Sequence, residues 1–154
     1  MKNKISSPLI IAILIPLAVG SISALFSGNM SIYSTLSKPA FSPPALVFPI
    51  VWTILYILMG ISSYLIYKTD NPQKYKALRI YILQLVFNFF WSIIFFGFSQ
   101  YRLAFLWLLL LIIMIFVMIY RFYQISPLAA YLQIPYLIWC LFAAYLNLMI
   151  VLMN

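Results

Sequence analysis

The run LLLLIIMIFVMI, residues 108–119, contains twelve consecutive apolar residues. It lies within a longer apolar stretch from about residue 103 to residue 123. A helix of about 20 apolar residues is long enough to cross the hydrocarbon core of a bilayer. Strands of a membrane barrel would alternate apolar and polar residues, and this run does not alternate. The stretch therefore predicts a transmembrane helix.

The rest of the chain has the same character. Of its 154 residues, 67% are hydrophobic and only 6% are charged, too little charge for the surface of a soluble domain. Backbone groups in hydrocarbon must be paired within a helix or a closed barrel, so we predict an all-α fold, an integral membrane bundle of five transmembrane helices. One domain covers residues 1–154, with helices expected at residues 8–27, 44–67, 78–98, 103–123 and 127–153.

The first apolar stretch has an alternative interpretation. Lys2 and Lys4 precede it and small residues stand near its end, a pattern that also fits a cleaved signal peptide. Its length favours a retained helix, as do Gly20, Ala24 and Gly28 at four-residue spacing, because small residues on one face let helices approach closely.

The ionisable residues limit the possible chemistry. The chain has no histidine, one acidic residue (Asp70) and one cysteine (Cys140). It therefore lacks a carboxylate pair for acid–base catalysis, and we expect no metal site. A disulfide within the chain and a proton relay through intramembrane carboxylates are excluded for the same reason.

The basic residues give the chain a formal net charge of +8. They stand at the ends of apolar runs, where they would contact lipid headgroups, so no nucleic-acid partner is expected. Five spans place most of them at the N-terminal end of the bundle, namely Lys2, Lys4, Lys68, Lys74, Lys76, Arg79 and Arg121. Only Lys38 and Arg102 fall at the other end, which predicts a multi-pass protein of the cell membrane with a cytoplasmic N-terminus.

Three of the predicted helices carry a stripe of aromatic and polar residues at steps of three and four. The stripes are Trp52, Tyr56, Gly60 and Tyr64; then Gln84, Asn88, Ser92 and Phe95, with Trp91 beside them; then Tyr136, Trp139, Ala143 and Asn147. Gly60 and Ala143 stand beside large rings, which favours a slot for a planar, mostly apolar ligand oriented by amides. Buried amides also join helices without any ligand, and tryptophans near span ends often lie at the bilayer surface, as we expect for Trp107.

The fourth helix has no such stripe. We expect it on the outside of the bundle, against lipid or a second protomer.

The segment KPAFSPPALVFPIVW, residues 38–52, contains four of the nine prolines. Prolines fix φ and bias the preceding residue toward extended conformations, so this segment should be stiff. Ordered irregular backbone is tolerated at a membrane where it lines a cavity. We therefore expect it to cover the slot, with Pro44 in the first turn of the second helix.

The residues of the stripes and the proline-rich segment also carry a family resemblance. Over nearly its whole length the chain resembles the TspO/MBR family of tryptophan-rich sensory and translocator proteins. The matching positions are Tyr33, Leu36, Lys38, Pro39, Phe41, Pro43, Pro44, Val47, Phe48, Trp52, Leu55, Tyr56, Met59, Gly60, Tyr64, Leu65, Gln84, Leu85, Asn88, Trp91, Ser92, Phe95, Phe96, Pro135, Tyr136, Trp139, Phe142, Ala143, Leu146 and Asn147.

The resemblance implies a five-helix membrane protein, commonly a homodimer, that binds a porphyrin such as protoporphyrin IX or haem and requires no cofactor. Members also bind isoquinoline carboxamide and benzodiazepine drugs, and some bind cholesterol. The family's pocket lies among the first, second, third and fifth helices. Its expected residues here are Trp52, Asn88, Trp139, Ala143 and Asn147, with Tyr33 and Pro43 in the cover, and the stripes add Tyr56, Gln84 and Trp91.

The chain departs from the family pattern in three places. Ile32 stands where the family has a tryptophan before Tyr33, and Phe41 replaces a second tryptophan of the loop. The final stretch AYLNLMIVLMN has no basic residue after its tyrosine, so sterol binding through the family's recognition pattern is not expected.

Three functions follow from these patterns. The one we expect is a receptor, sensor or translocator that binds a porphyrin without enzymatic turnover, with Lys38 or Arg102 near its propionates. The second is light- and oxygen-dependent porphyrin degradation with Trp52 and Trp139 as redox-active rings, which needs no acid–base pair. The third is a structural protein that assembles through its first or fourth helix and binds no small ligand.

Overall fold

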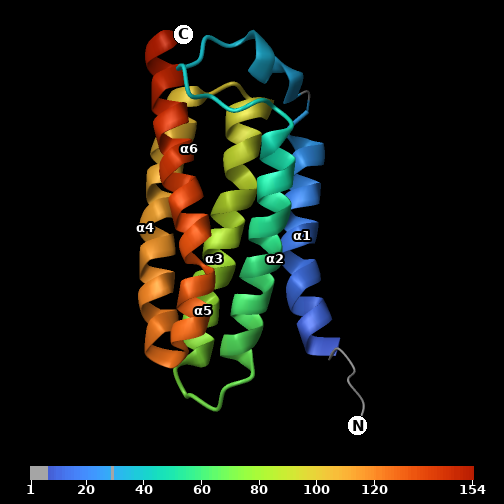
Figure 1. Cartoon of the computed structure of the whole chain (residues 1–154), viewed down its shortest axis with the longest axis vertical. Helices are drawn as coiled ribbons and strands as arrows, with labels where there is room; N and C mark the ends of the chain where they lie inside the picture. Colours follow the sequence, from blue (N-terminus) through green and yellow to red (C-terminus); the bar gives the residue numbers. More distant parts are fainter. Residues whose placement is uncertain (1–6, 29) are drawn as a thin grey trace.

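A computed structural model describes residues 7–28 and 30–154 as an up-and-down bundle of long helices (Figure 1). The helices are α1 (Ser7–Phe26), α2 (Val47–Tyr67), α3 (Lys74–Ser92), α4 (Tyr101–Ile125), α5 (Pro127–Leu132) and α6 (Ile134–Met153). A turn of 3-10 helix, η1 (Met30–Thr35), follows α1, and a π-helical turn, η2 (Ile93–Gly97), extends α3. Within the described ranges, five spans are long and apolar enough to cross a membrane, which confirms the predicted fold class.

The observed boundaries differ from the predicted ones where local turns intervene. Helix α2 begins at Val47 and not at 44, because Pro44 lies in a turn whose carbonyl accepts the N–H of Val47 at 3.0 Å. Helix α3 begins at Lys74, earlier than the predicted 78, after a turn in which the Asn71 side chain accepts the N–H of Gln73 at 2.8 Å. The fifth span is divided at residue 133 into α5 and α6, since Pro135 has no N–H and suits only the first turn of a helix.

Helix α1 docks on α2 through a contact between backbones. Pro16 lies inside α1 and offers no N–H to the carbonyl of Ala12. That carbonyl lies against Gly60 of α2: a methyl group at Gly60 would be 2.6 Å from the Ala12 oxygen and 2.5 Å from the Ile13 Cα. The interpretation of Gly60 as part of a ligand slot was therefore wrong, because the backbone of α1 occupies its surface.

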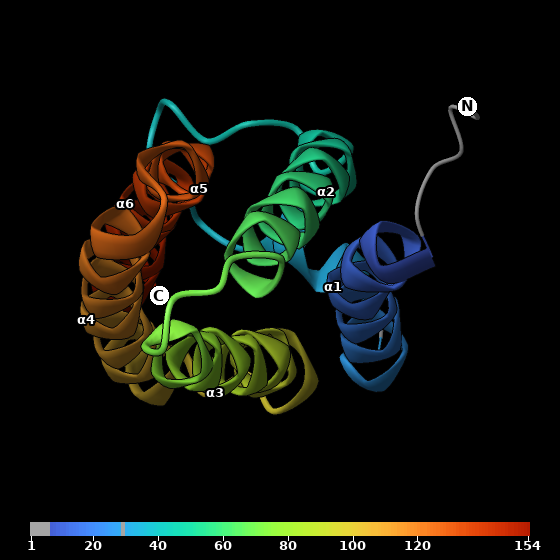
Figure 2. The ribbon, with the colours of Figure 1, turned by 90° about the horizontal axis from the view of Figure 1, so that it is seen from below.

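Helices α1 and α4 lie at opposite edges of the bundle (Figure 2). The inner face of α4 is fully packed, as the burial of Ile115 and Phe122 shows. Trp107, which stays predicted to lie at the bilayer surface, joins α4 to α3: its ring stacks on Phe87 with centroids 4.4 Å apart, and its Nε1 donates to the Phe87 carbonyl at 2.8 Å.

The two ends of the bundle differ in charge. The loop after α2 and the turn after α4 lie at the same end as the N-terminus (Figure 1), so that end carries Lys68, Lys74, Lys76, Arg79 and Arg121. Lys38 and Arg102 lie at the opposite end, beside the C-terminus. Lys2 and Lys4, which the prediction also used, fall outside the described residues.

The Gly60 contact makes a stability prediction. Gly60→Ala forces apart two backbones, so the free energy of unfolding should fall by about 1–3 kcal/mol. The melting temperature in detergent can be followed by dye labelling of Cys140, whose buried thiol reacts once the bundle opens. Gly97→Ala is the matched control, because a methyl there meets its nearest atoms at an ordinary 3.5 Å. Equal melting temperatures for the two variants would contradict the docking contact.

Candidate ligand-binding pocket

A cavity of about 400 Å³ lies in the half of the bundle nearest η1 and the proline-rich segment. This volume falls within the range of about 300–1,000 Å³ that is typical of small-molecule sites. Its walls come from α1, η1, α2, α3, η2 and α6 and from Ala45 of the proline-rich segment, and no described residue of α4 lines it.

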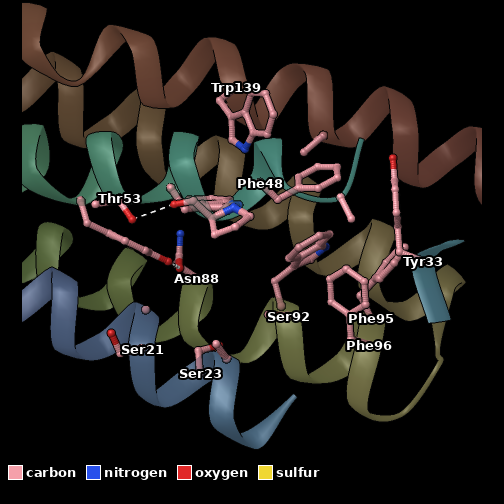
Figure 3. A pocket seen from close by; sticks show the side chains of 18 of the residues that line it. Ser21, Ser23, Tyr33, Phe48, Thr53, Asn88, Ser92, Phe95, Phe96 and Trp139 are labelled. Carbon is pink, nitrogen blue, oxygen red and sulfur yellow. Dashed lines mark hydrogen bonds between the residues drawn. The ribbon is translucent and has the colours of Figure 1, made fainter. Parts of the chain in front are cut away.

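The wall formed by α1 is made of small residues apart from Leu17. Gly20, Ser21, Ser23 and Ala24 line the cavity, and Figure 3 shows Ser21 and Ser23 along this wall. A methyl group at Gly20 would collide with the ring of Tyr56, so this glycine lets the ring pack flat against α1. Hydroxyl groups hold α1 to α3, since Ser23 Oγ donates to the Phe89 carbonyl at 2.6 Å.

The other walls are aromatic. Trp52 stacks on Tyr56, with ring centroids 5.4 Å apart and planes inclined by 27°. Phe48 meets Trp139 edge to face at 5.8 Å, so rings from α2 and α6 form adjoining surfaces. Figure 3 shows Trp139 and Asn88 pointing into the cavity from opposite walls. The walls thus offer ring faces to a flat ligand and amides to its polar groups.

A buried hydrogen-bond network forms the floor of the cavity. The Tyr56 hydroxyl donates to Asn88 Oδ1 at 2.7 Å, and Asn88 Nδ2 donates to the Tyr136 hydroxyl at 3.0 Å. That hydroxyl in turn donates to Gln84 Oε1 at 2.6 Å. The network joins α2, α3 and α6. An amide has two N–H donors and two acceptor lone pairs, so Asn88 keeps one of each for a ligand.

Asn147 holds the Trp91 ring in place. Its Oδ1 accepts from Trp91 Nε1 at 3.2 Å, and its Nδ2 donates to the Tyr101 carbonyl at 3.0 Å. Asn147 is 1% exposed, so both bonds are shielded from solvent. This amide therefore orients a pocket ring and also anchors the start of α4.

The cover of the pocket is ordered by its own hydrogen bonds. The Tyr33 hydroxyl donates to the Pro43 carbonyl at 2.8 Å. Burial raises the pKa of the Tyr33 phenol. Lys38 Nζ donates to the carbonyls of Tyr33 and Leu36 at 2.8 and 2.9 Å, so Lys38 braces the cover and has one N–H left. The Asn154 side chain ties the cover to α6 through both backbone groups of Ser37.

Comparison with known proteins shows which family the chain belongs to. Residues 12–153 match the TspO/MBR family. The chain belongs to the TspO/MBR family. It is 35% identical to the tryptophan-rich protein TspO of Chlorobaculum tepidum over 99% of both chains. It is 36% identical to the translocator protein homolog of Schizosaccharomyces pombe over 93% of this chain and 90% of that one. It is 42% identical to the translocator protein of Homo sapiens over 75% of this chain and 70% of the human one.

These matches confirm the resemblance predicted from the sequence. Together with the five spans, they make the chain a multi-pass integral membrane protein of the TspO/MBR family.

Most residues predicted to bind the ligand surround this cavity. Those that line the cavity are Tyr33, Trp52, Tyr56, Asn88, Trp91, Trp139, Ala143 and Asn147. Pro43 and Gln84 are not among the lining residues: Pro43 accepts the Tyr33 hydroxyl bond, and Gln84 lies beyond Tyr136, fully buried. The position of these side chains is therefore known, and their role in binding stays a prediction.

The resemblance placed the first helix at the pocket, but sequence reasoning named no residue of the α1 wall and did not name Phe48 as a binding residue. The signal for the wall was present, because Gly20 and Ala24 were recognised as a small-residue face, but that face was assigned to helix packing alone. Phe48 belongs both to the proline-rich segment and to the helix predicted from residue 44, and it was not named as a ligand-binding residue. It lies in the first turn of α2 and points into the cavity (Figure 3).

The floor network makes a second stability prediction. Tyr136→Phe removes a hydroxyl that both accepts from Asn88 and donates to Gln84, leaving two buried amides short of a partner. The free energy of unfolding should fall by about 1–3 kcal/mol. The melting temperature in detergent measures the loss. Tyr145→Phe is the control, because Tyr145 lies on the same helix and is 40% exposed. A Tyr136→Phe protein as stable as the control would show that the network contributes nothing.

Proposed function

We propose that this protein binds a porphyrin in the cavity and acts as a receptor, sensor or translocator, without enzymatic turnover. One observation carries the proposal: Trp52, Trp91 and Trp139, from three different helices, line a single cavity that also receives the Asn88 amide. Aromatic rings stabilise a flat apolar ligand by stacking and by burial of its surface. The TspO/MBR resemblance described from the sequence implies the same ligand class.

The polar groups suggest how the ligand is oriented. Asn88 has one donor and one acceptor left, in the floor. Lys38 has one N–H left, and Arg102 lies at the same end of the bundle. A porphyrin would therefore turn its ring toward the floor and its propionates toward the cover. Isoquinoline carboxamides and benzodiazepines, which are also largely flat, would occupy the same space. We also propose that the protein works as a homodimer.

We further propose that the N-terminal end faces the cytoplasm of the cell. That end carries most of the described basic residues, and short basic loops stay on the cytoplasmic side. A reporter domain fused after Asn154 should then lie outside the cytoplasm. A reporter that is found in the cytoplasm would show that the protein has the opposite orientation.

The binding proposal is tested by replacing two pocket tryptophans. A Trp52→Phe/Trp139→Phe protein loses ring area on two walls, and each aromatic contact is worth about 0.5–1.5 kcal/mol beyond burial. Its affinity for protoporphyrin IX should fall by about tenfold, measured by porphyrin absorbance in detergent. Trp107→Phe is the matched control, because Trp107 does not line the cavity. Equal affinities for the double variant and the control would contradict the assigned site.

The same samples separate the other two functions. Under light and oxygen, a new bilin-like absorbance that needs Trp52 and Trp139 would support porphyrin degradation. A ligand that binds only the native state must raise the melting temperature. If protoporphyrin IX leaves the melting temperature unchanged at saturating concentration, the protein is better described as a structural partner.

A further inference from the structure

Beneath the pocket floor, α2, α3 and the junction of α5 and α6 carry further buried polar side chains. Three side chains there have buried polar atoms that find no hydrogen-bond partner among the described residues. These atoms are Nε2 of Gln84, both Nε2 and Oε1 of Gln133, and the hydroxyl of Tyr81, which lies near the Ser63 side chain but not at hydrogen-bonding geometry. Tyr81 is 3% exposed, and Gln84 and Gln133 are 0% exposed.

The register of the helices brings these groups to one level. Helices α3 and α6 run in the same direction (Figure 1), and the bond from the Tyr136 hydroxyl to Gln84 Oε1 fixes their alignment. Tyr81 precedes Gln84 by three residues, and Gln133 precedes Tyr136 by three. Because a helix rises 1.5 Å per residue, both lie about 4.5 Å farther from the pocket than the Tyr136–Gln84 bond.

Helix α2 closes this level from the third side. It runs antiparallel to α3, and the bond between Tyr56 and Asn88 sets the register of the two helices. Residues of α2 that lie one to two turns after Tyr56 are therefore opposite residues of α3 that lie one to two turns before Asn88. Ser62 and Ser63 occupy those positions and are buried. Ser62 Oγ donates to the Ala129 carbonyl of α5 at 2.7 Å, which packs α2 against the junction. Each serine oxygen keeps a lone pair that can accept a hydrogen bond.

The energetics require a polar occupant for these groups. A buried polar group without a partner costs about 1–3 kcal/mol in proteins, and lipid around the bundle supplies no compensating donor. Gln133 alone has two N–H donors and two acceptor lone pairs to satisfy. Leaving both ends of one buried amide unpaired would be exceptional for a folded protein.

The chemistry of the site selects a small neutral occupant. Tyr81 and Gln133 can each donate and accept, and Gln84 Nε2 donates. The described residues contain no group of three metal ligands, and the site has no charged side chain to hold an anion. Ordered water fits, because it makes two to four hydrogen bonds with polar groups that the protein leaves unpaired.

We propose that ordered water molecules occupy this level of the bundle and bridge Tyr81, Gln84 and Gln133. The water extends the chain of bonds that runs from Tyr56 through Asn88 and Tyr136 to Gln84. The Asn88 amide, which faces the ligand pocket, is thereby held by a chain of hydrogen bonds. This chain continues toward the end of the bundle that carries most of the basic residues. Buried water occurs about once per 27 residues, so a few molecules here are ordinary for a chain of this length.

The sign of one stability change tests the proposal. If Gln133 holds water, Gln133→Leu removes two donors and two acceptors and leaves Tyr81, Gln84 and the water short of partners. The melting temperature in detergent should then fall. If the amide is dry, the same change only relieves an unpaired polar group, and the melting temperature should rise. Gln124→Leu is the matched control, because Gln124 is exposed at the end of α4.

A second measurement on the unaltered protein keeps the test independent of folding defects. X-ray-generated hydroxyl radicals modify buried side chains only where water lies beside them. Tyr81 should be modified several times faster than Phe122, whose ring lies 6.2 Å away and is fully buried. Support requires both results, a lower melting temperature for Gln133→Leu and faster modification of Tyr81. A higher or unchanged melting temperature, or equal modification of the two rings, would overturn the proposal.

Discussion

The hydrogen-bonded group of Tyr56, Asn88, Tyr136 and Gln84 is the interaction on which the pocket depends. It joins α2, α3 and α6 at one depth, and every bond in it is between side chains that are 8% exposed or less. In lipid the hydrophobic effect does not drive one helix against another, so polar contacts and close packing set the arrangement. Above this group the three helices can carry large rings around a cavity without collapsing, because the floor fixes their separation.

Close packing of α1 against its neighbours also shapes the pocket. Gly60 lets the backbone of α1 approach α2, and Gly20 gives room to the ring of Tyr56. The same helix then presents small residues to the cavity, so that space remains between it and the aromatic walls. The serine bonds from Ser23 to the Phe89 carbonyl and between Ser27 and Ser92 hold its upper half to α3. The wall is thus made mostly of small side chains, and it is held by the close backbone contact with α2 and by the serine bonds to α3.

The sequence predicted the features that arise within a single helix better than those that depend on packing between helices. The spans and the three stripes were predictable, because apolar length and helical spacing act locally. Asn88 and Trp139 were recognisable, since polar and aromatic side chains on an apolar helix mark the face turned toward protein. Gly60 was misassigned and the wall at Gly20 was missed, because a small residue does not show whether it faces a ring, a backbone or a void. The unpaired amide of Gln133 depends on register between helices, which no single helix encodes.

The most direct test of the central claim uses the four tryptophans as reporters. Three of them line the cavity, and Trp107 packs between α4 and α3. A porphyrin ring shifts the NMR resonances of nuclei close to its face, so indole N–H signals can be followed during titration of labelled protein with protoporphyrin IX. The account predicts large shifts for Trp52, Trp91 and Trp139 and none for Trp107. Unchanged signals from the three pocket rings at saturation, or a shift confined to Trp107, would contradict it.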